Sequence, residues 1–316
     1  MAAEGKRVLA FHYAWYGTPW GPAGQWVGWK GERHDPDIAR SGLRECTAAH
    51  YPLDGLYDSL SDETMRRQIA EAKEAALDGF IVSWWGTKHY SHRVLLRMCE
   101  LAPEDFLTIY YETAMTHKLR DTNRPAAIKR IAEDLALLLE GPAKGASWMK
   151  VNGKPVIFVY IVGSYTVNEW AAVREELTKQ GLDAFLVGDT LDPAYLDVFD
   201  GLHTYSPAGI LASGRSLRDV YVKAAEACRG RGKLFAATVM PGYDDRKIRK
   251  PGLYVPRGDG STYDHTWRAA LACDPDWILV CTWNEWYEGT EIEPSVEFGK
   301  DYILQTARYA RAWKGS

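Results

Sequence analysis

Residues 281–294 read CTWNEWYEGTEIEP and place four carboxylates and two tryptophans directly behind an apolar run. Glu285 and Glu288 lie three positions apart, a spacing that lets both side chains project to one side of a turn or of a first helical turn. When two carboxylates are close together, the pKa of one rises and that group keeps its proton. Hydrolysis of a glycosidic bond needs such a pair, because one group protonates the leaving oxygen and the other assists attack.

The same spacing also occurs at the start of ordinary helices, where two glutamates only complement the helix dipole. Here Asn284, Trp286 and the position behind an apolar strand favour the catalytic interpretation. We expect the other two carboxylates of the segment, Glu291 and Glu293, to be structural or solvated. Of the four carboxylates, only Glu285 and Glu288 are therefore predicted to take part in chemistry.

Eight short apolar runs of strand length divide the chain, and amphipathic segments of helical periodicity lie between them. Continuous apolar strands that alternate with helices predict a parallel sheet covered by helices, and eight such units predict a closed (β/α)8 barrel. A doubly wound open sheet is the alternative. At 316 residues we expect one catalytic domain spanning residues 1–316. The predicted strands begin at Arg7, Gly79, Phe106, Pro155, Ala184, Asp200, Lys233 and Trp277, and the predicted helices cover 61–78, 125–140, 168–180, 217–229, 265–272 and 302–314.

Two long loops, residues 17–60 after the first strand and residues 241–263 after the seventh, lie on the side where barrel enzymes build their sites. Aromatic and acidic residues gather at the ends of the other strands as well. Sugars require this combination, because their C–H faces stack on aromatic rings while their hydroxyls need polar partners. The residues at these strand ends are His12, Tyr13, Trp15, Tyr16, Trp84, Trp85, Tyr111, Glu112, Tyr160, Tyr165, Asp189, His203, Tyr205, Tyr243, Asp244, Asp245 and Arg249.

Composition and missing motifs argue against other functions. The net charge is −4 and no Lys/Arg cluster interleaves with aromatics, so we expect no nucleic-acid partner. No apolar run approaches membrane-span length, so we expect no membrane partner. The chain lacks GxGxxG, GxxxxGK[ST] and GxSxG motifs, which disfavours phosphate cradling and an acyl-transfer serine. His89 and His92 look like part of an exposed loop, so neither a metal nor another cofactor is predicted.

The N-terminus reaches the first predicted strand within about six residues, which leaves no room for a signal peptide. Five scattered cysteines without metal-type spacing suit a reduced compartment. We therefore expect a cytoplasmic protein, unless the sequence is that of a trimmed secreted protein. The oligomeric state is not indicated by the sequence.

Eight motifs, taken together and in order, resemble those of glycoside hydrolase family 99, the endo-α-1,2-mannosidase and endo-α-1,2-mannanase family. The resemblance covers nearly the whole chain, and the last motif is its most specific part. It implies a (β/α)8 fold and retaining, endo-acting cleavage of α-mannosidic linkages, α-1,2 among them, without a metal. The motifs are FHYAWYG at Phe11, HYPLDGLYDS at His50, GFIVSWWG at Gly79, IYYE at Ile109, PVIFVY at Pro155, FDGLHTYS at Phe199, MPGYDDRKIR at Met240 and TWNEWYEGTEIEP at Thr282.

The resemblance also implies an unusual mechanism, in which the substrate's own 2-hydroxyl attacks the anomeric carbon and gives a 1,2-anhydro sugar. Glu285 would deprotonate that hydroxyl, and Glu288 would protonate the leaving oxygen and later activate water. The residues alone leave open whether Glu285 is instead the nucleophile of ordinary retaining chemistry.

The substrate is expected to be an oligosaccharide or polysaccharide. By resemblance, Tyr205 and Arg249 contact the sugar next to the cut and Glu112 holds sugar hydroxyls. Trp85 stacks on the sugar one site further out, where a tryptophan favours mannose over glucose. The full predicted set of substrate-binding residues is Tyr13, Tyr16, Trp84, Trp85, Glu112, Tyr205, Tyr243, Arg249, Asn284 and Trp286.

The chain departs from the family pattern in the first long loop, where QWVGWKGERHDP has a displaced His34, and after the third strand, where IYYETAM has Tyr110 and Ala114. These positions shape subsites, so linkage and sugar identity stay open. The alternatives are a carbohydrate-binding barrel without activity, and a transglycosylase or hydrolase that acts on a different α-linked glycan.

Overall fold

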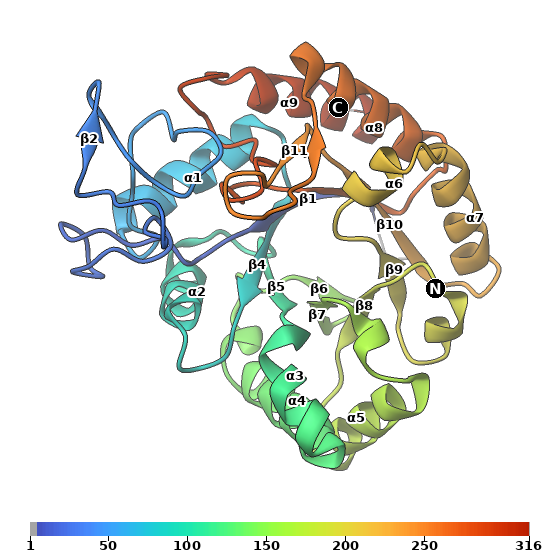
Figure 1. Ribbon diagram of the computed structural model, residues 1–316. Coiled ribbons are helices and arrows are strands. Elements are labelled where there is room, and N and C mark those ends of the chain that lie inside the picture. The colour runs from blue at the N-terminus through green and yellow to red at the C-terminus, as the bar shows by residue number, and fades with distance from the viewer. Residues whose placement is uncertain (1–4, 316) are drawn as a thin grey trace.

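The computed structural model describes residues 5–315 and contains a closed ring of eight parallel strands (Figure 1). Neighbours in the ring follow the order β5-β4-β1-β13-β10-β9-β8-β7, and β7 pairs with β5 to close it, with Ile109 opposite Ile157. This closure confirms the (β/α)8 barrel and rules out the doubly wound alternative. All eight predicted strands are present: β1 (Arg7–His12), β4 (Gly79–Trp84), β5 (Leu107–Tyr111), β7 (Lys154–Val159), β8 (Phe185–Asp189), β9 (Gly201–His203), β10 (Leu234–Val239) and β13 (Trp277–Val280).

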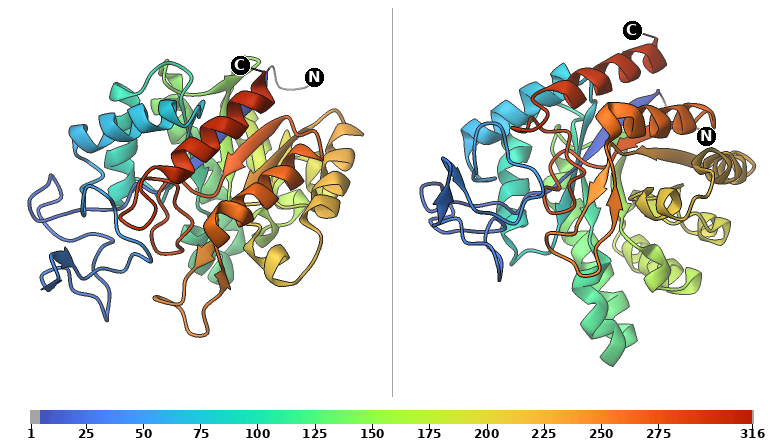
Figure 2. Two further views of the ribbon diagram at one scale, coloured as in Figure 1. Left: turned by 90° about the horizontal axis from the view of Figure 1, so that it is seen from above. Right: turned by 45° about the horizontal axis from the view of Figure 1, so that its top comes forward.

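Helices surround the ring and cover its outer face (Figure 2). Local signals fix their starts: the Ser61 side chain accepts a hydrogen bond from the Thr64 N–H, and Thr166 and Glu169 form a complete capping box. The helices are α1 (Asp62–Glu74), α2 (Tyr90–Leu101), α3 (His117–Thr122), α4 (Arg124–Glu140), α5 (Val167–Lys179), α6 (Ala208–Ala212), α7 (Leu217–Arg229), α8 (Ser261–Leu271) and α9 (Asp301–Lys314), with 3-10 turns η1 (Thr113–Thr116), η2 (Pro142–Lys144), η3 (Val162–Ser164), η4 (Pro193–Asp197) and η5 (Gly258–Gly260).

Helix α2 was not predicted, and the interpretation of His89 and His92 as an exposed loop was wrong. The His89 side chain caps α2 by accepting a hydrogen bond from the Ser91 N–H, and His92 lies within the helix. The first turn of α2 is polar, so its sequence shows no apolar stripe there. The apolar residues Val94 and Met98 follow and are fully buried against the barrel.

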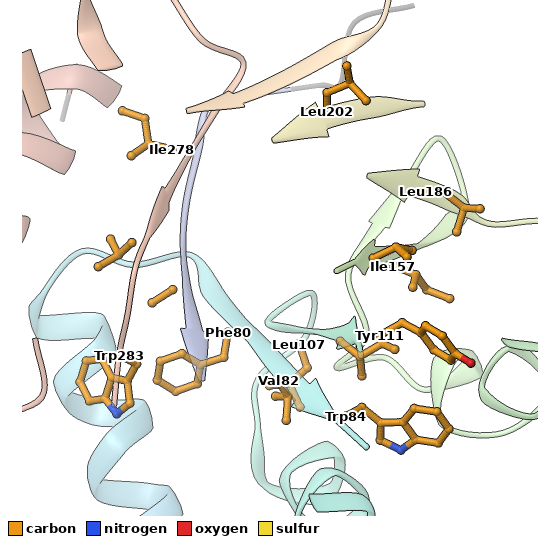
Figure 3. Close-up of a cluster of buried hydrophobic side chains, with 14 of the residues drawn as sticks. Phe80, Val82, Trp84, Leu107, Tyr111, Ile157, Leu186, Leu202, Ile278 and Trp283 are labelled. Atoms are coloured by element: carbon orange, nitrogen blue, oxygen red, sulfur yellow. The ribbon is translucent and has the colours of Figure 1, made fainter. Parts of the chain in front are cut away.

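Side chains of the strands alternate between two apolar layers. One layer fills the inside of the barrel, with Leu9, Phe11 and Ile81 among its members. The other lies between the strands and the helices, and it includes Phe80 and Trp84 (Figure 3). The period of two along each strand decides which residues can reach the mouth of the barrel.

The two long loops meet at the carboxyl ends of the strands. The first carries β2 (Ala39–Arg40) and β3 (Leu43–Arg44), and the second carries β11 (Tyr243–Asp244) and β12 (Tyr254–Val255). Lys247 Nζ donates to the Ala48 carbonyl at 2.6 Å, and the Ala49 N–H donates to the Trp286 carbonyl at 2.7 Å. Outside these loops, the short strand β6 (Lys150–Val151) pairs with β7 in the antiparallel direction.

No helix within residues 5–315 is long and apolar enough to span a membrane.

Candidate active site

Glu285 lies in the turn that follows β13 and is almost completely buried, with 3% of its surface exposed. The Thr282 hydroxyl oxygen accepts a hydrogen bond from the Glu285 N–H at 2.8 Å and fixes the start of the turn. The carboxylate accepts the Tyr287 N–H at 3.3 Å, and it forms no ion pair within the described chain. Burial, with the nearby Glu288 carboxylate second, holds the pKa of Glu285 well above its ordinary value.

Glu288 occupies a different environment three positions further on. Its Oε1 atom accepts a hydrogen bond from Arg249 Nη1 at 2.9 Å. Its Oε2 atom is buried and has no hydrogen-bond partner among residues 5–315. The Asp244 N–H donates to the Glu288 carbonyl at 2.7 Å and ties this residue to β11. One oxygen of Glu288 is thus held by a cation, while the other is buried and makes no hydrogen bond within residues 5–315.

Arg249 comes from the second long loop and reaches this pair from the side of β10. Its Nη1 atom lies 2.7 Å from both the Tyr243 hydroxyl oxygen and Asp245 Oδ2, besides its contact with Glu288. The Arg249 side chain remains about half exposed, at 51%. Because Asp245 is buried and holds Arg249 from behind, the guanidinium is fixed at one end and open to solvent at the other.

Aromatic side chains line the opening beside the two glutamates. The Tyr13 hydroxyl donates to the Tyr205 hydroxyl oxygen at 2.7 Å, and both rings are more than nine-tenths buried. The Trp15 ring lies 4.6 Å from that of Tyr13, stacks on Tyr287 at 5.8 Å and approaches Trp85 at 5.9 Å. These rings offer flat apolar faces together with hydroxyl groups, as a sugar requires.

Glu112, at the end of β5, is 2% exposed and adds a third carboxyl group. The Ser83 hydroxyl donates to its Oε1 atom at 2.7 Å, and Trp85 Nε1 donates to the Ser83 oxygen at 2.9 Å. Burial raises the pKa of Glu112 to about 8, and the charges of Asp189 and Glu288 add to this effect. Trp85, Ser83 and Glu112 are thus joined in one chain of hydrogen bonds.

Asp189, at the end of β8, is a fourth carboxyl group of the opening. Its two oxygens accept the N–H groups of Ile161 at 3.1 Å and Tyr205 at 2.9 Å. Burial raises the pKa of Asp189 to about 6. The second hydrogen bond makes Asp189 a support for the backbone that carries Tyr205.

Three of the predicted substrate-binding residues lie beneath the opening, since Tyr16, Asn284 and Trp286 are fully buried. Asn284 bridges to Tyr13, accepting its N–H at 2.6 Å and donating to its carbonyl at 3.0 Å. Both Asn284 Nδ2 and Trp286 Nε1 donate to the Tyr57 hydroxyl oxygen at 3.0 Å. These residues position Glu285 and Tyr13 and do not line the open space.

Trp84 lies away from the site, so its predicted contact with substrate does not fit the structure. Its side chain belongs to the layer between strands and helices (Figure 3), where Nε1 donates to His92 Nδ1 at 3.1 Å. Strand β4 continues through residue 84, and its alternation turns Ser83 toward the inside of the barrel and Trp84 outward. Trp85, just past the strand, reaches the opening instead.

Three residues that support this site, Tyr57, Ser83 and Arg257, were not predicted. Ser83 shares the inward register of Ile81, a signal that strand alternation provides. Tyr57 and its partner Asn284 are 227 residues apart, and no local pattern predicts such a contact. Within residues 5–315, no group of three His, Cys, Asp or Glu side chains is arranged to hold a metal ion.

Carboxyl groups in unlike environments, set among aromatic rings at the carboxyl ends of a (β/α)8 barrel, are the features that a glycoside hydrolase requires. The family model of glycosyl hydrolase family 99 matches residues 4–303, and the chain belongs to this family. This confirms the family resemblance of the motifs and the assignment as an enzyme of this class.

Curated relatives and solved structures agree with this membership. The chain is 26% identical to the human glycoprotein endo-alpha-1,2-mannosidase-like protein, over 91% of this chain and 68% of that protein. It is 24% identical to the rat glycoprotein endo-alpha-1,2-mannosidase, over 92% and 68%. The fold matches the structure of the GH99 endo-alpha-mannosidase from Bacteroides thetaiotaomicron with a TM-score of 0.77 and 22% identity, over 98% of both chains.

Proposed function

We propose that this chain is a retaining endo-acting α-mannosidase that cleaves α-1,2 linkages within an oligosaccharide or polysaccharide. Family membership supports the class of reaction, and the names of the relatives support the sugar. The observation that carries the proposal is the contrast between Glu285, which is buried without a cation, and Glu288, which has one oxygen on Arg249 and one unpaired. Two carboxyl groups in such unlike settings suit acid and base roles.

In the proposed mechanism the substrate's 2-hydroxyl acts as the nucleophile. Glu285 accepts the proton of this hydroxyl while its oxygen bonds to the anomeric carbon, and Glu288 Oε2 donates a proton to the leaving oxygen as the glycosidic bond breaks. The product of this step is a 1,2-anhydro sugar. Glu288 then takes a proton from water, and the water oxygen attacks the anomeric carbon as the bond from that carbon to the 2-oxygen breaks. Glu285 returns its proton to the 2-oxygen. Two inversions give net retention.

Glu285 must lose its proton when it acts as the base. In the unliganded protein burial favours the protonated form of Glu285. A bound 2-hydroxyl that donates a hydrogen bond to Glu285 favours the charged form that the proposed role needs.

Arg249 is placed to bind the sugar next to the cut. Its half-exposed guanidinium is anchored by Asp245 and can turn toward the hydroxyls of that sugar. Since the same guanidinium contacts Glu288, sugar binding and the position of the acid would be linked through Arg249.

Activity on defined α-mannosides tests the proposal. Oligosaccharides with internal α-1,2, α-1,3 or α-1,6 linkages should be incubated with the protein and the first product followed by NMR. We expect cleavage at α-1,2 linkages, release of the α-anomer, and a loss of about 10²–10⁴-fold in kcat in Glu288→Gln. Release of the β-anomer, or hydrolysis unchanged by that substitution, would contradict the proposed mechanism.

A structure of Glu288→Gln with a bound α-mannoside separates the two retaining mechanisms. A Glu285 oxygen within hydrogen-bond distance of the 2-hydroxyl supports the base role. A Glu285 oxygen in line with the anomeric carbon and remote from that hydroxyl would make it the nucleophile of an ordinary retaining enzyme.

A further inference from the structure

A groove of about 490 Å³ runs beside the opening, between the residue that follows β4 and the helices α3 and α4. This volume lies within the range of about 300–1,000 Å³ typical of small-molecule sites. Its wall at the end toward the catalytic opening is Trp85. The other lining residues are Met115, Thr116, Lys118, Leu119, Thr122, Arg130 and Asp134.

Trp85 connects the groove to the catalytic residues. Through Nε1 it holds Ser83, which in turn holds Glu112, so the inner edge of the indole is fixed beside the carboxyl groups. Gly86 follows with φ +94°, and a Cβ atom there would lie 3.5 Å from Met115 Sδ. The positive φ favours glycine at this position, and a Cβ there would make only an ordinary contact with Met115. A larger groove of about 600 Å³, which includes Leu191, contains none of the site residues.

The groove offers the chemistry that a sugar ring needs. Met115 and Leu119 provide apolar surface, and Leu119 is 36% exposed. Arg130 Nε is bound to Asp134 Oδ1 at 2.8 Å, which fixes the guanidinium, and neither Nη group is hydrogen-bonded within residues 5–315. Lys118 adds a second exposed donor. Apolar faces beside fixed donors match a ring with C–H faces and peripheral hydroxyls.

The position of the groove indicates which side of the cut it serves. In the ring of strands β4 and β10 are three places apart, so Trp85 lies across the barrel from Arg249 and the second long loop. Glu288, which would protonate the leaving oxygen, is bound to that loop. The leaving part of the glycan is therefore expected near Arg249, and the non-reducing part near Trp85.

We propose that this groove is an additional glycan subsite, which binds the sugar beyond the one on Trp85 at the non-reducing side. The inference rests on the proposed function and adds to it a preference for longer chains over short ones. Binding of this remote sugar helps to hold the reacting sugar in place, so its loss lowers kcat/KM.

Two aryl glycosides that differ by one sugar measure the contribution of the groove, because the aryl group fixes the position of the cut. A 4-nitrophenyl α-mannobioside fills the sites as far as Trp85, and the matching mannotrioside adds one sugar at the non-reducing end. The ratio of kcat/KM values, trioside over bioside, is measured in the wild type, in Leu119→Asp and Arg130→Gln, and in Leu137→Asp as the control. Leu137 is an equally exposed leucine on α4 that does not line the groove.

We expect a ratio of about ten in the wild type and in Leu137→Asp, and a ratio near one in the two groove variants, with hydrolysis of the bioside unchanged. A wild-type ratio near one, or a ratio that both groove variants retain, would overturn the proposal. If neither glycoside is hydrolysed, the proposed function fails. Calorimetric titration of both glycosides into the wild type then tests whether the groove binds the additional sugar. Equal Kd values for the two glycosides would exclude this subsite.

Discussion

The turn after β13 contains two pairs of glutamates that differ in how their charges are balanced. Glu291 and Glu293 are 1% and 3% exposed, and each accepts hydrogen bonds from an arginine. Glu285 is equally buried but accepts no hydrogen bond from an arginine within residues 5–315. Glu288 and Glu291 each have one oxygen without a partner in the described chain, but the arginine that pairs with Glu288 is 51% exposed, whereas the one that pairs with Glu291 is 8% exposed. Buried groups left unsatisfied are typical of functional sites, whereas paired ones hold the structure together.

Glu291 and Glu293 stabilise the segment that carries Glu285 and Glu288 through two separate connections. Glu291 accepts Arg257 Nη2 at 2.6 Å, and the same nitrogen donates to the Gly289 carbonyl at 3.0 Å, next to Glu288. Glu293 accepts the Tyr57 hydroxyl at 2.8 Å, and Tyr57 is the residue that holds Asn284, next to Glu285.

This comparison explains how a protein can keep two carboxyl groups close together in a buried place. Their mutual repulsion favours separation, so the backbone on both sides must be fixed by stronger contacts. Arg257 supplies such a contact, since it also packs over the rings of Phe298 and Tyr302, both at 4.5 Å. The prediction that Glu291 and Glu293 are structural agrees with these contacts.

Arg257→Met is expected to have the largest effect on stability. Removing the buried cation leaves Glu291 uncompensated, and we expect a loss of about 3–5 kcal/mol in the free energy of unfolding, measured by urea denaturation. Arg97→Met is the control, because Arg97 pairs with Asp62 and Glu100 at the surface and should change stability by less than about 1 kcal/mol. Equal effects in both variants would show that Arg257 is no anchor.

Tyr57→Phe tests the other connection with a smaller change. The hydroxyl makes three hydrogen bonds, to Glu293, Asn284 and Trp286, and its loss leaves buried polar groups without a partner. We expect a loss of about 1–3 kcal/mol in the free energy of unfolding. Because Asn284 loses its support, kcat should fall more than KM rises. A stable variant with unchanged kinetics would contradict a positioning role for Tyr57.

Glu112→Gln is expected to change stability least at low pH, and its effect grows as the pH rises. Burial raises the pKa of Glu112 from its ordinary 4.5 to about 8. The stability associated with the protonated form is full below pH 4.5 and is lost as the pH rises through about 8. Glutamine resembles the protonated form, so the variant should match the wild type at pH 4.5 and be more stable than the wild type at pH 8.5.

Thermal unfolding at the two pH values measures this difference, and assays at pH 7 should show reduced turnover because the predicted sugar contact is altered. A variant less stable than the wild type at pH 8.5 would mean that the charged form of Glu112 is favoured in the folded protein.

The fold could be predicted almost entirely from the sequence, because each strand is a short apolar run and most helices have a clear apolar stripe. Helix α2 was missed, since the mostly polar residues 87–93, which precede the helix and form its first turn, contain no apolar stripe. Closure of the ring depends on the contact of β5 with β7, which eight alternating units indicate but cannot prove.

The site was predictable at its centre and less so at its edges. The spacing of Glu285 and Glu288 predicted that they act as a pair. The family motifs predicted that Arg249 and Glu112 belong to the same site. The side to which Trp84 points depends on where β4 ends, and a single residue of uncertainty turns the side chain to the other face. The role of Arg257 depends on a contact over 34 residues, which no local pattern reveals.

The most direct test of the comparison is one experiment on four variants, Glu285→Gln, Glu288→Gln, Glu291→Gln and Glu293→Gln. For each, kcat/KM and the free energy of unfolding are measured at pH 7, with an oligosaccharide in which the linkage to be cut is α-1,2 and the reacting mannose has a free 2-hydroxyl. We predict that the first two variants lose turnover by about 10²–10⁴-fold and remain as stable as the wild type, whereas the last two unfold more easily and keep most of their turnover per folded molecule. Loss of stability in the first two with turnover preserved would contradict the account.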